Sequence, residues 1–148
     1  MKPGIFLKST SLLDNTFFGT SVMYITEYNE KGAMGFVVNK KFSRNLNELE
    51  EFKHILPFPI YVGGPVDQEH LYFLHRRPDL VTGGEPVADN VFLGGDFQAA
   101  VKLINNNTLT ANDIKVFIGY CGWDYRELDQ ELAEGSWQLL EAGNPFSL

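Results

Sequence analysis

The sequence is short of cysteine and contains no long apolar run. Its single cysteine, Cys121, cannot form a disulfide within the chain, which is typical of a protein in a reducing compartment. The first ten residues, MKPGIFLKST, have too few consecutive apolar residues for a signal peptide, and no later run is long enough to span a bilayer. We therefore expect a cytoplasmic protein without a membrane-spanning segment.

Basic residues are also scarce. The chain has 12 Lys and Arg against 19 Asp and Glu, which gives a net charge of −7. Proteins bind duplex DNA largely by neutralising its phosphates with Lys and Arg, so this balance argues against direct nucleic-acid binding. The two small basic clusters, at 40–44 and 76–77, are better explained as solvated loops. No helix-turn-helix, zinc-finger or ribonucleoprotein motif is present.

Patterns that bind cofactors or metals are missing as well. Gly63-Gly64-Pro65 lacks the lysine of a phosphate-binding loop and the spacing of a dinucleotide-binding motif. The three histidines have no spacing that would bring them together as zinc ligands. We expect neither a cofactor nor a metal ion.

The residues that are present predict one mixed α/β (α+β) domain over 1–148. With 44% apolar and 21% charged residues, the composition is that of an ordinary globular protein. Residues 20–28 and 33–39 are rich in β-branched and aromatic residues and flank a glycine turn, which predicts a β-hairpin. Apolar residues at i, i+3, i+4 and i+7 from Phe97, after a capping Asp96, predict a helix.

The rest of the chain is organised around the stretch from Ile114 to Trp137. Residues 116–118 predict a strand buried on both faces, and the glycines of 119–122 predict a tight turn after it. Asp124-x-x-Glu127 has the pattern of a capping box, which predicts an acidic helix ending at Gly135. Asn45-x-x-Glu48 has the same pattern and predicts a short helix reaching about Lys53.

Cys121 has two possible roles. Near a helix N-terminus its thiol could have a lowered pKa and act as a nucleophile, with His75 as the base. The sequence departs from the nucleophile-elbow pattern, however, because Trp123 stands where that pattern needs its final glycine. Free cysteines are more often small buried hydrophobic residues, and we favour that role.

Three other segments have a functional and a structural interpretation. Asn39 could bind a ligand through its amide or close a turn onto its own backbone, which is common for asparagine after a strand. Gly63-Gly64-Pro65 could allow close approach of a ligand or form a tight strand exit. His75 could act as an acid–base group or hydrogen-bond a carbonyl in the core.

Four motifs in order carry a family resemblance that spans residues 4–146. The motif Gly119-Tyr120-Cys121-Gly122-Trp123, followed by an acidic helix, resembles the AlgH/YqgE family of small bacterial proteins. The other motifs, in the family's order, are Ser21–Val22 leading to 29–35, Val38–Lys40, and Gly63–Val66 with Leu74–His75 beyond it. Members are described as transcriptional regulators. The resemblance implies a bent, partly barrel-like β-sheet surrounded by helices, and it implies no particular reaction.

Two hypotheses for function follow. The first is a regulatory or interaction protein that acts through a protein partner or a small molecule instead of binding DNA. Its candidate binding residues stand at predicted strand ends and would line one recess: Asn39, Gly63, Gly64, Pro65, His75, Gly119, Tyr120, Cys121, Gly122 and Trp123. The alternative is a thiol-dependent enzyme that uses Cys121 with His75.

Overall fold

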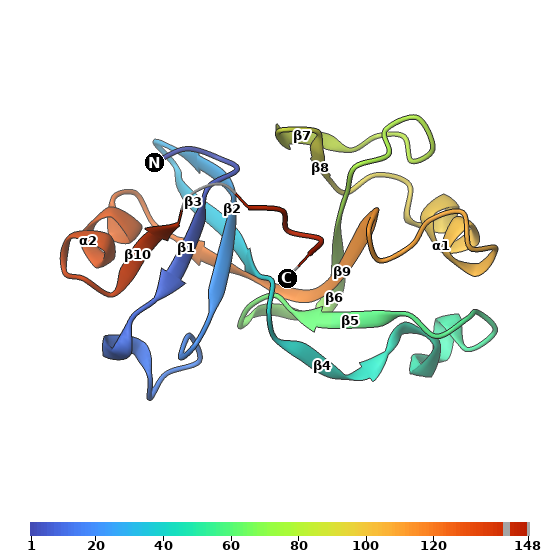
Figure 1. Ribbon diagram of the computed structural model, residues 1–148, viewed down its shortest axis with the longest axis horizontal. Coiled ribbons are helices and arrows are strands. Elements are labelled where there is room, and N and C mark those ends of the chain that lie inside the picture. Colours follow the sequence, from blue (N-terminus) through green and yellow to red (C-terminus); the bar gives the residue numbers. More distant parts are fainter. Residues whose placement is uncertain (141–142, 148) are drawn as a thin grey trace.

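The computed structural model describes residues 1–140 and 143–147, and its organising element is a strand that belongs to two sheets. This strand, β9 (Ile114–Trp123), runs between the two halves of the molecule (Figure 1). Its first part pairs antiparallel with β6 (Val66–His75) and parallel with β5 (Pro59–Val62). Its last residues pair antiparallel with β3 (Gly32–Val37). Both halves are therefore built on one backbone segment.

The half that contains the N-terminus is an antiparallel meander closed by a late strand. Its β2 (Val22–Asn29) pairs with β3 as a hairpin, and β1 (Phe6–Ser9) pairs with β2. On the outer side of β1 lies β10 (Trp137–Leu140). Packed beside β10 is α2 (Glu127–Ala133), which follows β9 in the chain. The chain thus returns to its own first strand after completing β9.

The other half extends β6 and β5 outward. A short hairpin of β7 (Glu85–Ala88) and β8 (Val91–Leu93) pairs with the end of β6, and β4 (Lys41–Asn45) pairs with β5. The remaining helical elements are α1 (Phe97–Asn105) and three 3₁₀ turns at Ser11–Leu13, Leu46–Glu48 and Glu50–Phe52. Neither α1 nor α2 is long and apolar enough to cross a bilayer, and no other described helix is.

The expected fold, a mixed α/β (α+β) domain with a bent, partly barrel-like sheet surrounded by helices, is wrong. Among the described residues the protein is mostly one ten-stranded sheet, and its end strands β10 and β7 do not pair to close a barrel. The two α-helices of this part of the chain have 9 and 7 residues and lie at opposite ends of the long axis (Figure 1). They cover the ends of the sheet instead of surrounding it.

Helices are fewer and shorter than expected because neither of the two capping boxes starts a long helix. The box at Asn45 and Glu48 forms in full, but Leu49 is extended at ψ 142°, so the segment splits into two 3₁₀ turns. At Asp124 only half of the box forms. In that half the Glu127 side chain accepts a hydrogen bond from the Asp124 amide at 3.2 Å. Arg126 is left-handed at φ 65°, which delays the start of α2 to Glu127. The helix predicted from Asn45 is therefore wrong, whereas the acidic helix predicted after Asp124 is confirmed as α2, with Gly135 at φ 85° just beyond its end.

The glycine turn predicted at 119–122 is also wrong. These residues continue β9, with Tyr120 opposite Val66 and Cys121 opposite Gly35. The β2–β3 hairpin and α1 are confirmed. The Asp96 side chain caps α1 by accepting from the Ala99 amide at 3.1 Å.

Candidate functional site

The two predicted glycine motifs meet at a backbone crossing. A Cβ on Gly64 would lie 2.1 Å from the Tyr120 carbonyl, and one on Gly119 would lie 2.3 Å from the Gly64 oxygen. Such distances are far inside van der Waals contact, so only glycine allows β9 to pass this closely over the chain that follows β5. The motifs are thus brought together, and Gly64 and Gly119 are used for packing.

Cys121 lies beside this crossing and is 1% exposed. Its Sγ donates to the Gly63 carbonyl at 3.3 Å. Burial raises the pKa of the thiol to about 12, since the thiolate would lose its hydration. A thiol held in this way is protonated at neutral pH, the opposite of the low pKa that a cysteine nucleophile needs.

His75 lies at the end of β6, opposite Ile114 at the start of β9. Ile114 and Cys121 are seven residues apart along β9, which at about 3.3 Å per residue is roughly 23 Å. His75 is fully buried, with Nε2 3.1 Å from the Gly94 oxygen and Nδ1 accepting from the Arg77 amide at 3.2 Å. Burial lowers its pKa. The geometry therefore separates the base and the nucleophile of the thiol-enzyme hypothesis.

Asn39 and Trp123 have partners of their own. The Asn39 side chain accepts from the Val22 amide at 2.9 Å and donates to the Thr20 carbonyl at 3.0 Å, which closes the turn before β2. The Trp123 indole donates to Glu131 at 3.2 Å, and the Trp137 indole donates to the same carboxylate oxygen at 3.0 Å. Of the remaining candidates, Pro65 and Gly122 are exposed. The structure thus brings the two glycine motifs and Cys121 together, but Asn39, His75 and the Trp123 indole have other partners.

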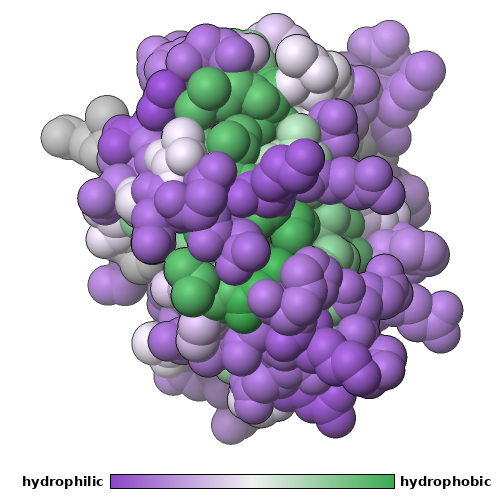
Figure 2. All heavy atoms as spheres, turned by 90° about the vertical axis from the view of Figure 1, so that its right-hand side faces the viewer, coloured by the Kyte–Doolittle hydropathy of each residue, from purple (hydrophilic) through white to green (hydrophobic). Residues whose placement is uncertain are grey.

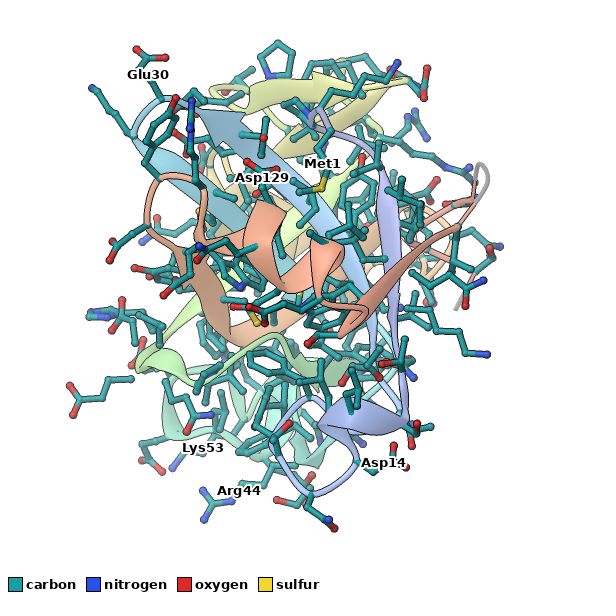
Figure 3. The ribbon with its side chains drawn as sticks, turned by 90° about the vertical axis from the view of Figure 1, so that its left-hand side faces the viewer. Met1, Asp14, Glu30, Arg44, Lys53 and Asp129 are labelled. Carbon is teal, nitrogen blue, oxygen red and sulfur yellow. The ribbon has the colours of Figure 1, made fainter. Side chains whose placement is uncertain are left out.

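A recess does lie at the C-terminal end of β9, but other residues line it. It has a volume of about 430 Å³ and is formed by the turn of the β2–β3 hairpin and the segment that joins β9 to α2. In Figure 3, Glu30 lies at the tip of the hairpin and Asp129 on α2. The lining side chains that bear charge or aromatic rings are Tyr28, Glu30, Asp124, Tyr125, Arg126 and Asp129.

One interaction joins the two segments that form the recess. The Tyr28 hydroxyl donates to both carboxylate oxygens of Asp129, at 2.7 and 2.8 Å, although the residues are 101 positions apart. This hydrogen bond to the carboxylate raises the pKa of Tyr28. The Leu128 side chain is buried beneath, in the cluster that contains Trp123 and Trp137. The wall of the recess is therefore anchored to the core of this half.

Tyr125 and Arg126 form the exposed side of the recess. Tyr125 is 56% exposed, and the Arg126 guanidinium lies 5.1 Å from its ring centroid. The left-handed backbone at Arg126 costs about 1–2 kcal/mol for a residue with a Cβ. The recess thus combines carboxylates, a phenolic ring that already holds a cation, and one guanidinium. Sequence reasoning missed it, although the glycine turn at 29–32 and the predicted β9–α2 junction marked its two walls.

Sequence reasoning also missed Lys115, which is buried near the start of β9 at 4% exposure. Its Nζ donates to the carbonyls of Val38 at 2.7 Å and Pro145 at 3.0 Å, and lies 4.1 Å from the centroid of the Tyr61 ring. Burial lowers its pKa to about 8. The available signal was a charged residue inside the apolar run of 114–118. Lys115 fastens the segment that contains Pro145 onto the shared strand.

The part of the chain that the structure describes contains no evident metal-binding site. No three His, Cys, Asp or Glu side chains there are grouped so that they could hold an ion. What the site offers instead is a polar, aromatic recess with fixed hydrogen-bonding groups.

These features define a class of small proteins in which one long strand joins an antiparallel sheet to a mixed sheet. A family model described as AlgH-like matches residues 6–147. The chain belongs to this AlgH-like family, which confirms the resemblance found in its motifs.

Individual relatives agree with this assignment. The UPF0301 protein of Chlorobium limicola is 36% identical over 143 residues, which cover 96% of this chain and 76% of the relative. A UPF0301 protein of Bacteroides fragilis is 33% identical over 97% of this chain and 73% of its own.

Solved structures share the fold. The solution structure of AlgH from Pseudomonas aeruginosa superposes with a TM-score of 0.75 at 25% identity, covering 98% of this chain and 80% of that one. A crystal structure of a Corynebacterium diphtheriae protein has a TM-score of 0.77 at 20% identity, covering 99% and 78% of the two chains, and supports the fold alone.

Proposed function

We propose that this protein is a regulatory binding protein that acts through a small ligand or a protein partner held at the β9 recess. Any effect on transcription would pass through that bound molecule, because a net charge of −7 opposes direct contact with DNA. The observation that carries the proposal is the recess itself, where a hydrogen bond between Tyr28 and Asp129 fixes two distant segments around a volume of about 430 Å³.

The chemistry of the recess favours a ligand group with a positive charge and hydrogen-bond donors. Glu30, Asp124 and Asp129 supply three carboxylates against the single guanidinium of Arg126. The ring of Tyr125 faces a cation already, and an ammonium group could take the same position over it. Aromatic surface and fixed acceptors in a concave site are typical of small-molecule and peptide recognition.

Ligand-induced thermal stabilisation tests the proposal. The complete chain is screened against matched sets of primary amines, short cationic peptides and carboxylates, with duplex DNA included as a separate ligand. We expect amines or cationic peptides to raise the melting temperature, and we expect Tyr125→Ala to abolish that shift. Glu134→Gln is the control, since Glu134 is an exposed carboxylate next to α2 that does not line the recess.

Two results would contradict the proposal. The first is that no amine or peptide stabilises the protein, or that one does so equally in the Tyr125→Ala variant. The second is tight binding of duplex DNA at physiological salt, which would restore a direct role in nucleic-acid binding.

A further inference from the structure

A second concave surface lies in the other half of the molecule, between α1 and the 3₁₀ turn at Glu50–Phe52. Two hollows of about 470 and 500 Å³ share Glu51 and Phe52 as a common border. Figure 2 views the molecule from the α1 side, where apolar side chains reach the surface between polar ones. The apolar lining is Phe52, Ile55 and Val101 in the first hollow, and Leu49, Phe52, Leu71, Phe97 and Ile118 in the second. We call this surface the Phe52 groove.

Packed aromatic rings form the floor of the Phe52 groove. The Phe52 ring packs edge-on against Phe97 at 5.7 Å between centroids, and Phe97 packs against the buried Phe73 at 5.1 Å. Phe97 stands at the start of α1, next to its capping Asp96. Partly buried apolar side chains around the groove belong to the main hydrophobic cluster of this half. The groove is therefore a preformed surface, which lowers the entropic cost of binding a partner.

The rim of the second hollow is acidic. Glu50, Glu51 and Glu69 line it, and no Lys or Arg does. Lys53 lies outside the lining and pairs with Glu50 at 2.9 Å, so it offsets the charge of one of the three rim carboxylates. His70, which also lines the second hollow, is hydrogen-bonded to Asp67. The basic side chains that line the first hollow are Lys102 and His54. The two hollows together thus present apolar surface with an excess of negative charge.

We infer that the Phe52 groove docks a basic amphipathic segment of a partner protein. Apolar side chains on one face of such a segment, at positions such as i, i+3, i+4 and i+7, would fill the hollows on either side of Phe52. Its Lys and Arg residues would face the three glutamates of the rim, where complementary charge speeds association and selects the partner. The Phe52 groove is a different surface from the recess at the end of β9. Glu30 near the recess and Lys53 near the groove lie at opposite ends of Figure 3.

A synthetic helical peptide of Leu and Lys, without tryptophan and labelled with a fluorophore, tests this inference. Fluorescence anisotropy with the complete chain should show binding that weakens as salt rises from about 50 to about 500 mM, since rim charges are screened. The double variant Glu51→Lys/Glu69→Lys reverses two exposed charges of the rim without touching the core. We expect it to bind at least about tenfold more weakly.

Two controls separate this site from the rest of the surface. Glu134→Lys reverses an exposed glutamate in the other half and should leave peptide affinity unchanged. Tyr125→Ala should also leave it unchanged, so failure of the β9 recess as a ligand site would not disturb this result. The two tryptophans lie in the other half, at Glu131, and their fluorescence should not respond to the peptide.

Any of the following outcomes would overturn the inference. One is binding of a matched Leu and Glu peptide with equal affinity, or no binding of the basic peptide at millimolar concentration. A second is unchanged affinity in the double variant. The third is a dimer of the wild-type chain in analytical ultracentrifugation that dissociates in the double variant, because the groove would then be covered by a second copy.

Discussion

Lys115→Met should change how the stability of the protein depends on pH. In the folded chain burial lowers the pKa of Lys115 from 10.5 to about 8. Between these values the unfolded chain holds a proton that the folded chain has lost, so the free energy of unfolding increases with pH through this window. At about 1.4 kcal/mol per pH unit, the whole window corresponds to about 3 kcal/mol.

At neutral pH the substitution has two opposing effects. Removing the buried charge relieves about 3 kcal/mol, the cost of keeping the amine protonated inside the fold. Methionine cannot donate, however, so the Val38 and Pro145 carbonyls lose a partner, at about 1–3 kcal/mol each. These terms nearly cancel or leave a net loss. The absolute stability at pH 7 is therefore a poor test, and the pH dependence is the informative quantity.

Urea unfolding of both proteins, followed by tryptophan fluorescence, measures that dependence. Between about pH 7.5 and about pH 9.5 the wild type should gain about 2 kcal/mol relative to Lys115→Met. Cys121 titrates with the opposite sign above pH 9, since its pKa is raised to about 12, but it is present in both proteins and cancels in the difference. A difference in unfolding free energy that stays constant with pH would refute the assignment of a desolvated lysine.

Three further predictions concern the shared strand and its surroundings. The Cys121 thiol should resist labelling in the native state at pH 8 and react only as the protein unfolds in urea; fast native labelling would indicate an accessible thiolate. Gly64→Ala should destabilise the fold by more than about 2 kcal/mol in thermal unfolding, since its Cβ would lie 2.1 Å from Tyr120. Gly122→Ala, whose Cβ would lie 3.6 Å from its nearest neighbour, should cost less than about 1 kcal/mol in the same assay. Glu131→Gln keeps an acceptor for both indoles and should preserve the native tryptophan emission, whereas Glu131→Leu should shift it and lose about 2 kcal/mol or more of stability; equal spectra would show that the indoles have other partners.

Local patterns predicted the elements that form from local interactions. The hairpin at 20–39 has a turn of residues suited to it between two β-branched runs, and α1 has both a capping aspartate and helical periodicity. Both therefore appear near their predicted bounds. The capping box at Asn45 satisfied the same local rules, but 3₁₀ turns followed it, and after the box at Asp124 a left-handed Arg126 shortened the predicted acidic helix to α2. Tertiary packing outweighed helix-start signals there.

The candidate site depended on pairings that no local pattern reveals. The turn predicted at 119–122 followed from its two glycines, but Gly119 lets β9 cross the chain at Gly64, and Gly122 is an exposed strand residue. The Tyr28–Asp129 bond joins residues 101 positions apart, and the burial of Lys115 depends on a carbonyl 30 positions away. Such long-range contacts require the register of β3 with β9, which a single sequence does not specify.

The position of β9 in the chain has a consequence for synthesis on the ribosome. Its pairing partners β3, β5 and β6 all precede it, and Cys121 must meet Gly35, a residue made 86 positions earlier. Until about residue 123 has left the exit tunnel, these strands have exposed edges and no common neighbour. The nascent chain should therefore remain protease-sensitive until most of it has been translated, and then gain protection in both halves together.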